Sequence, residues 1–322
     1  IVGLHIPQFI IPDFMTPEEW SKIWRYRVDF GDTRTLQEVG GVSTEEGFRE
    51  ITQKDLQDLC SLDYRDSTEI KRAYLAGKLK YRFIVSGCDW GGSDYQMSHA
   101  AKTSYTVHVI FGVKGDGTID ILHMQRHSGM IYEEIAALII QEHLKLSGTA
   151  IASDYGAGMA YNTLLHRDTR INPNKHFIWH YNAPFSPMIM KPTFQQFTTH
   201  YLLNKTESIT QVFDAIKNGR IRCYGWENAQ THLSDILNCQ RVHSESRHGK
   251  QYFLHIRSPS RADDTLHAIN FAYVLTRLLL KEPMFDDMNL RTQVYDNLGM
   301  GPAVQAAKEQ HTTNMRHLVG SG

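Results

Sequence analysis

The sequence lacks the patterns of two large classes of protein. No GxxxxGK[ST] phosphate-binding loop occurs in its 322 residues, and that loop is what cradles nucleotide phosphates in many motors. We therefore expect no ATP hydrolysis from this chain alone. No apolar run is long enough to cross a bilayer, and no signal-peptide pattern is present. We therefore expect neither a membrane partner nor secretion.

Cysteine is scarce, and neither sign of charge dominates. The four cysteines form no CxxC pair, which argues against a zinc cluster and favours reduced core thiols. The seventeen histidines are scattered without an HExxH pair, which argues against a histidine zinc site. The formal net charge is −1, so no global basic field indicates nucleic acid. A neutral protein can still carry a local basic groove.

Three short acidic segments do stand out. They are residues 87–92 (GCDWGG), 152–158 (ASDYGAG) and 261–268 (RADDTLHA). The first two place Asp89 and Asp154 at the end of an apolar, β-prone run, just before glycines. The third places Asp263 and Asp264 in the opening turn of an apolar helix. Crowded carboxylates repel one another until a cation neutralises them. The segments therefore predict a divalent-cation site and metal-assisted phosphodiester cleavage.

Apolar periodicity predicts a mixed α/β core. Strands are expected at residues 81–88, 104–112, 118–126, 149–153 and 176–181, and helices at 130–146, 208–218, 227–239 and 261–281. The Gly-Asp-Gly turn at residues 115–117 makes the first three strands antiparallel neighbours. The order strand, strand, strand, helix, strand is typical of a ribonuclease-H-like sheet, in which three antiparallel strands are followed by parallel strands and helices flank both faces.

The segments resemble, in family order, the nuclease domain of the large terminase subunit of tailed bacteriophages, a member of the ribonuclease-H-like superfamily. Residues 87–91 are similar to its first-strand motif, 153–158 to its Asp-x-x-Gly-x-Gly motif and 263–268 to its final Asp-Asp-x-x-x-Ala helix. Upstream, residues 3–9, Trp20 and residues 35–41 resemble the stretch that leads from the ATPase motor into the nuclease.

This resemblance implies three parts. Residues 1–80 would form a linker region after an ATPase motor domain that is absent from this chain. Residues 81–283 would form the nuclease domain, with an inserted hairpin near residues 241–256. Residues 284–322 have few periodic apolar positions and would form a mobile C-terminal tail.

The resemblance also implies a metal-dependent endonuclease of viral genome packaging, which cuts concatemeric double-stranded DNA with little sequence preference. Two Mg²⁺ or Mn²⁺ ions roughly 3.5–4 Å apart would clamp the scissile phosphate. Asp89 would bridge both ions, Asp154 would hold one, and Asp263 or Asp264 the other. Its partners would be the portal protein, the small terminase subunit and the ATPase domain of the same polypeptide, at the procapsid portal in the cytoplasm of the infected host cell.

Basic residues near these segments are candidates for contacts to DNA phosphates, which would weaken as salt rises. The candidates are Lys102, Lys191, Arg241, Arg247 and Lys250. The last two lie in the polar turn expected at the hairpin tip, where a solvated turn is the simpler interpretation.

The acids have structural alternatives. Asp89 could be a turn aspartate beside glycines, and Asp154 could cap a helix that begins near residue 158. Asp263 stands three residues after Ser260, close to a capping-box pattern, which favours Asp264 as the metal ligand. Adjacent helical residues point about 100° apart, so both or only one could bind.

Other functions remain open. His267 is interpreted as a core histidine, or one that supports a ligand, and not as a general base. A ribonuclease-H-like junction resolvase or recombinase would use the same acids but prefer branched DNA. A catalytically silent packaging scaffold would keep the fold without cutting, although the presence of all three acidic segments argues against it.

Overall fold

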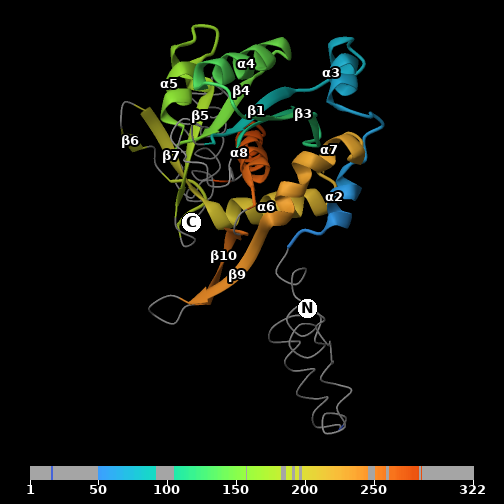
Figure 1. The fold of residues 1–322 in the computed structure, drawn as a ribbon, viewed down its shortest axis with the longest axis vertical. Coiled ribbons are helices and arrows are strands. Elements are labelled where there is room, and N and C mark those ends of the chain that lie inside the picture. The colour runs from blue at the N-terminus through green and yellow to red at the C-terminus, as the bar shows by residue number, and fades with distance from the viewer. Residues whose placement is uncertain are drawn as a thin grey trace, which may run out of the picture.

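The computed structural model describes residues 16, 50–91, 105–156, 158–182, 186–190, 193–195, 198–245, 251–258, 261–282 and 284. Figure 1 shows the arrangement of the elements. The strands are β1 (Phe83–Asp89), β2 (Thr106–Val113), β3 (Ile119–His127), β4 (Ala150–Asp154), β5 (His176–Asn182), β6 (Thr193–Gln195), β7 (Thr198–Asn204), β8 (Ile221–Arg222), β9 (Cys239–Glu245) and β10 (Gln251–Arg257). The α-helices are α2 (Gln53–Leu59), α3 (Ser67–Leu75), α4 (Tyr132–Lys145), α5 (Met159–Arg167), α6 (Lys205–Lys217), α7 (Trp226–Leu233) and α8 (Asp264–Leu279), and the 3₁₀ helices are η3 (Pro173–Lys175) and η4 (Ser234–Asn238).

The main sheet has the strand order β6-β7-β5-β4-β1-β2-β3-β8 within the described residues. Strand β2 runs antiparallel to both β1 and β3, whereas β4 runs parallel to β1, β5 to β4 and β7 to β5. The predicted ribonuclease-H-like architecture is therefore confirmed. Because the four parallel strands end at the same edge of the sheet, Asp89 at the end of β1 and Asp154 at the end of β4 lie at one edge.

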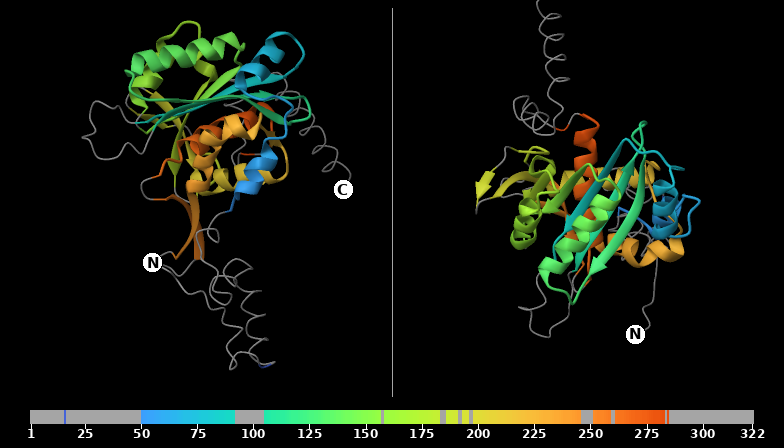
Figure 2. Two further views of the ribbon diagram at one scale, coloured as in Figure 1. Left: turned by 45° about the vertical axis from the view of Figure 1, so that its right-hand side comes forward. Right: turned by 90° about the horizontal axis from the view of Figure 1, so that it is seen from above.

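Helices cover both faces of this sheet (Figure 2). Helices α3, α4 and α5 lie on one face, and α2, α6, α7 and α8 lie on the other. Under α4 and α5 the apolar core includes Ile139, Ile151 and Leu165, all buried. Helix α8 is buried nearly all round, which is typical of a helix in the middle of a core and not at its surface.

Helix α8 approaches β1 closely because of Gly87. A Cβ built on Gly87 would lie 2.1 Å from the carbonyl oxygen of Ala268 and 2.8 Å from the Cβ of Ala272. Real Cβ atoms do not come so near, so only glycine lets the helix lie directly on the strand. This contact brings the first turn of α8 to the edge of the sheet where Asp89 stands.

The hairpin of β9 and β10 projects away from the body of the protein (Figure 1). Its strands pair antiparallel from Cys239 opposite Arg257 to Glu245 opposite Gln251. The expected basic tip, residues 246–250, lies outside the described residues. So do most of the expected linker, residues 1–80, and all of the expected tail but Met284. The domain boundaries therefore stay predictions.

Other expected elements form with shifts of a few residues, and three strands were not expected. The helix expected at residues 227–239 divides into α7 and η4, and β6, β7 and β8 all lie in the stretch that the sequence pattern left unassigned.

In the described part of the chain, none of the helices combines the length and the apolar character needed to cross a membrane.

Candidate active site

Four carboxylates from three distant segments meet at the end of β1. Asp89 is buried, and burial is the main reason that its pKa lies well above the usual value. The carboxylates of Asp154, Asp264 and Asp263 raise this pKa further because each negative charge disfavours ionisation of a neighbour. The structure thus brings together all four of the acids that the sequence singled out.

The glycines beside these acids are needed for close packing. A Cβ on Gly91 would lie 2.6 Å from the carbonyl carbon of Tyr105, and one on Gly156 would lie 2.5 Å from Oδ2 of Asp154. A Cβ on Gly158 would lie 1.9 Å from the Trp90 ring. Asp89 is also the last residue of a buried strand, so it is not simply a solvated turn aspartate.

Asp154 does not cap the following helix. The N-cap residue of α5 is Gly158, which makes no side-chain cap bond. Burial raises the pKa of Asp154 to about 7, against the backbone N–H groups of Tyr155 and Gly156 and the charge of Lys205, which all lower it. Asn162 donates a hydrogen bond from Nδ2 to the Asp154 carbonyl oxygen at 2.8 Å and so holds this turn in place.

Asp263 stands at the N-cap position of α8, but its side chain makes no cap hydrogen bond. Its Oδ2 instead accepts a hydrogen bond from Nε2 of His267 at 3.1 Å, and Nη1 of Arg257 lies 4.0 Å from Oδ1. Burial alone would raise the pKa of Asp263, but His267, Lys205 and Arg257 together lower it below the usual value. Asp263 is therefore held as an anion.

His267 is fixed by its other neighbours. Its Nδ1 lies 2.9 Å from the hydroxyl of Tyr181, which accepts a hydrogen bond from Nδ2 of Asn270 at 3.0 Å. Tyr181 can then donate to Nδ1 while Nε2–H donates to Asp263. His267 is thus a half-buried histidine bonded to one of the four acids, and its support of a metal ligand stays a prediction.

Asp264 has a different partner. It is the first residue of α8 and is buried, and its Oδ2 accepts a hydrogen bond from the backbone N–H of Tyr105 at 2.9 Å. Tyr105 directly precedes β2, which pairs with β1. Asp264 is thus tied to the same central strands that carry Asp89.

Lys205 is a site residue that the sequence did not indicate. It is the first residue of α6, directly after β7, and its charge lowers the pKa of Asp89, Asp154 and Asp263 against the effect of burial. The signal that would have found it is a basic residue after a parallel strand. That signal depends on recognising β7 as a strand of the main sheet.

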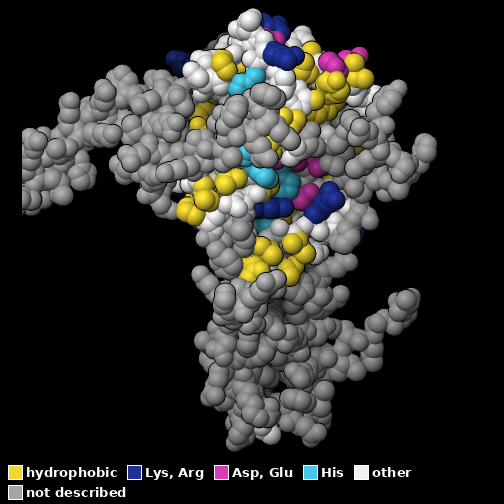
Figure 3. Space-filling model, turned by 90° about the vertical axis from the view of Figure 1, so that its left-hand side faces the viewer, with side chains coloured by type: hydrophobic (Ala, Val, Ile, Leu, Met, Phe, Trp, Pro, Cys, Tyr) yellow, Lys and Arg dark blue, Asp and Glu magenta, His cyan; other side chains and the backbone are white. Residues whose placement is uncertain are grey.

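The donor chemistry of this cluster suits a hard divalent cation, because four carboxyl groups, which can supply several oxygen ligands, lie near one another. As the side chains lie, however, no three His, Cys, Asp or Glu residues of the described segments are grouped closely enough to hold a metal ion. Asp263 and Asp264 point to His267 and Tyr105. Binding of an ion by three carboxylates would therefore require some of them to turn. Figure 3 shows acidic, basic and histidine side chains gathered near the centre of one face.

Of the predicted DNA contacts, only Arg241 falls in the described part of the chain. Its Nη1 lies 2.5 Å from Oε1 of Glu50, and its guanidinium lies 3.7 Å from the centre of the Phe253 ring. A phosphate would have to compete with this pairing. Lys102, Lys191, Arg247 and Lys250 lie outside the described residues.

The sequence matches no family model. No curated protein matches it either. Among solved structures, the large terminase nuclease of thermophilic phage G20c is 17% identical with a TM-score of 0.39, covering 60% of this chain and 84% of that chain. The nuclease domain of the large terminase subunit gp2 of bacterial virus Sf6 is 11% identical with a TM-score of 0.42, covering 69% and 98%. The large terminase nuclease domain of bacteriophage SPP1, with bound Mn, is 10% identical with a TM-score of 0.36, covering 66% and 92%. Solved structures that match this chain are thus nuclease domains of large terminases from several phages.

Proposed function

We propose that this chain is a metal-dependent endonuclease of phage genome packaging, which cuts concatemeric double-stranded DNA with little sequence preference. The observation that carries the proposal is the meeting of Asp89, Asp154, Asp263 and Asp264 at one edge of the sheet. Burial first, and then the charges of these acids, raise the pKa of Asp89 well above its usual value. A cluster of this kind is unfavourable without a cation.

We assign Asp89, Asp154 and Asp264 as ligands for Mg²⁺ or Mn²⁺, with Asp263 as a further ligand. Two such ions, when bound, would activate water and stabilise the leaving oxygen. Asp89 ends β1, which lies between β4 and β2 in the sheet, and it would contact both ions. Lys205 reduces the repulsion among the acids, and His267 holds Asp263 ionised and oriented.

The cellular role belongs to the same proposal. The chain would act at the procapsid portal in the cytoplasm of the infected host cell, with the portal protein, the small terminase subunit and an ATPase domain as partners. The solved nuclease domain of bacteriophage SPP1 contains Mn and that of phage G20c contains magnesium. We propose the same class of ion for this chain.

The test is a plasmid-nicking assay in Mn²⁺, with and without a chelator. Asp89→Ala should abolish cleavage while circular dichroism shows an intact fold. Asp58→Ala is the control, because Asp58 is exposed on α2 and pairs only with Lys54 in the described residues. Cleavage by Asp89→Ala at the wild-type rate would refute the assignment of this ligand.

Two further outcomes separate the alternatives. A strong preference for a four-way junction over linear duplex DNA would favour a resolvase or recombinase. Complete absence of metal-dependent cleavage by the wild-type protein would leave a packaging scaffold as the better interpretation.

A further inference from the structure

The first turn of α8 is tied to the 3₁₀ helix η4. The hydroxyl of Thr265 donates a hydrogen bond to Oδ2 of Asp235 at 2.7 Å, and both side chains are buried. Thr265 directly follows Asp264 in the chain. Loss of this contact would therefore shift the backbone next to Asp264, the residue that we assign as a metal ligand.

Arg126, near the end of β3, links this contact to the other side of Asp264. Its Nη2 lies 2.7 Å from Oδ1 of Asp235 and also donates to the carbonyl oxygen of Thr231. Its guanidinium lies 5.5 Å from the centre of the Tyr105 ring, and the backbone N–H of Tyr105 donates to Asp264. Arg126 therefore contacts both Asp235, the partner of Thr265, and Tyr105, a partner of Asp264.

Stability alone is a poor explanation for this arrangement. Burial raises the pKa of Asp235, and the charge of Asp264 raises it further. Thr265 and Arg126 lower this pKa but do not cancel the rise. An additional buried carboxylate beside an acidic cluster is unfavourable, and apolar side chains often replace a buried ion pair without loss of stability. A group that sets the geometry of a neighbouring ligand, in contrast, needs the directionality of hydrogen bonds.

We propose that Asp235 and Arg126 are positioning residues, which act through Thr265 and Tyr105 to hold the first turn of α8, and with it Asp264, close to Asp89, so that only the carboxylate of Asp264 has to turn for it to bind a divalent ion. This inference rests on the proposed function. The two oxygens of Asp235 contact Thr265 and Arg126, and the role proposed for Asp235 is to position this turn and not to bind the ion.

The experiment compares Thr265→Val and Arg126→Met with wild type, and measures the Mn²⁺ concentration that gives half-maximal cleavage. We expect this concentration to rise about 10-fold, as is usual when a partner of a metal ligand is removed. The maximum rate at saturating Mn²⁺ should recover toward the wild-type value. Asp235→Asn, which can still accept from Thr265, should be milder than Asp235→Ala.

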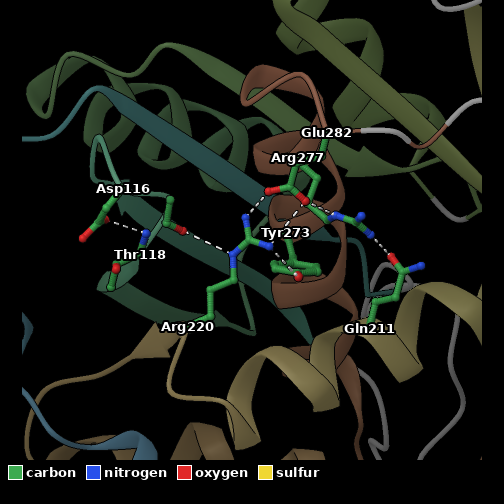
Figure 4. A network of polar contacts seen from close by, with 8 residues as sticks. Asp116, Thr118, Gln211, Arg220, Tyr273, Arg277 and Glu282 are labelled. Carbon is green, nitrogen blue, oxygen red and sulfur yellow. Dashed lines mark hydrogen bonds and ion pairs between the residues drawn. The ribbon is translucent and has the colours of Figure 1, made fainter.

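The matched control is Glu282→Gln at the other end of α8. Glu282 pairs with Arg220 and Arg277 (Figure 4). It follows the C-terminal end of α8, whereas Asp263 and Asp264 stand at the N-terminal end, so this variant should lose stability and keep the wild-type dependence on Mn²⁺. If Thr265→Val and Arg126→Met also keep it, the inference is wrong while the proposed function stands.

A second measurement does not depend on cleavage. Amide hydrogen exchange in residues 261–270 should be faster in Thr265→Val than in wild type and unchanged in Glu282→Gln. If the wild-type protein shows no metal-dependent cleavage, the proposed function fails, and the inference about Mn²⁺ fails with it. If amide hydrogen exchange in residues 261–270 is also unchanged in Thr265→Val, the inference that Asp235 positions this turn through Thr265 is wrong as well.

Discussion

Gly87 of β1 and Ala268 of α8 are in backbone contact, since a Cβ on Gly87 would lie 2.1 Å from the carbonyl oxygen of Ala268. The contact sets the distance between a strand that ends in Asp89 and a helix that begins with Asp264. Packing in the middle of the core therefore decides the geometry of carboxylates at its edge.

Gly87→Ala should push α8 away from β1. Overpacking of this kind typically reduces the free energy of unfolding by about 1–3 kcal/mol, and we expect cleavage to fall more than stability alone explains, because the acids separate. Urea denaturation and plasmid nicking measure the two effects. Gly115→Ala is the control, since nothing lies within 4 Å of a Cβ at that position. Full activity in Gly87→Ala would show that the site tolerates a displaced helix.

Asp154→Asn should be more stable than wild type at pH 8 and no more stable below about pH 4. Burial raises the folded-state pKa of Asp154 to about 7, above the value of about 3.9 in unfolded chains. The folded protein therefore binds this proton more tightly, and the stability gained from it is lost as pH rises from about 4 to about 7. Asparagine carries no charge at any of these pH values.

Differential scanning fluorimetry without metal tests this prediction. The Tm difference between Asp154→Asn and wild type should be on the order of 5 °C at pH 8, should be smaller at pH 5 and should disappear below about pH 4. Taking the difference between the two proteins cancels the other titrating groups. A difference that does not change with pH would contradict the raised pKa.

Lys205→Met should destabilise the metal-free protein at pH 8. Lys205 lowers the pKa of Asp89 and of Asp154 against the effect of burial, so its loss leaves their mutual repulsion less compensated. Saturating Mn²⁺ should restore much of the lost Tm, and the deficit should also shrink at pH 5, where Asp154 is protonated. Lys145→Met is the control, because Lys145 is exposed and only weakly paired. Equal Tm losses in both variants, insensitive to Mn²⁺, would argue against a role for Lys205 at the site.

Glu282→Gln should weaken the attachment of the C-terminal end of α8. Oε2 of Glu282 accepts from Nε of Arg277 at 2.6 Å, and Nε of Arg220 reaches the carbonyl oxygen of Gly117 in the turn between β2 and β3 (Figure 4). Loss of a hydrogen-bonded charge in this half-buried network should cost about 1–3 kcal/mol of unfolding free energy. Urea denaturation measures it, and a change below about 0.5 kcal/mol would place the pair among ordinary surface ion pairs.

The secondary structure could be predicted from the sequence where the pattern was local and strong. Strands β1 to β5 and helices α4 and α8 lie within a few residues of their expected positions, because alternating or helical apolar periods reflect which face is buried. Strand β7 was not expected. Its sequence, TTHYLLN, begins with polar residues, and it is a strand because it pairs with β5.

The alternatives for single acids could not be settled from the sequence. Both Asp154 and Asp263 stand where a helix cap is plausible, yet neither side chain caps a helix. Local spacing describes what a residue could contact within its own turn. It does not describe Arg257 and Lys205 near Asp263, or burial of Asp154, which depend on the packed fold.

By itself, the sequence determined the type and order of the acidic segments and of the core strands and helices, because these follow from residue chemistry and periods of two or 3.6 residues. The tertiary structure alone decided that Asp89 faces three other carboxylates, that Lys205 lies beside them, and that Asp263 and Asp154 have opposite pKa shifts. The physical reason is that burial and charge act through space, between residues that are far apart in the chain.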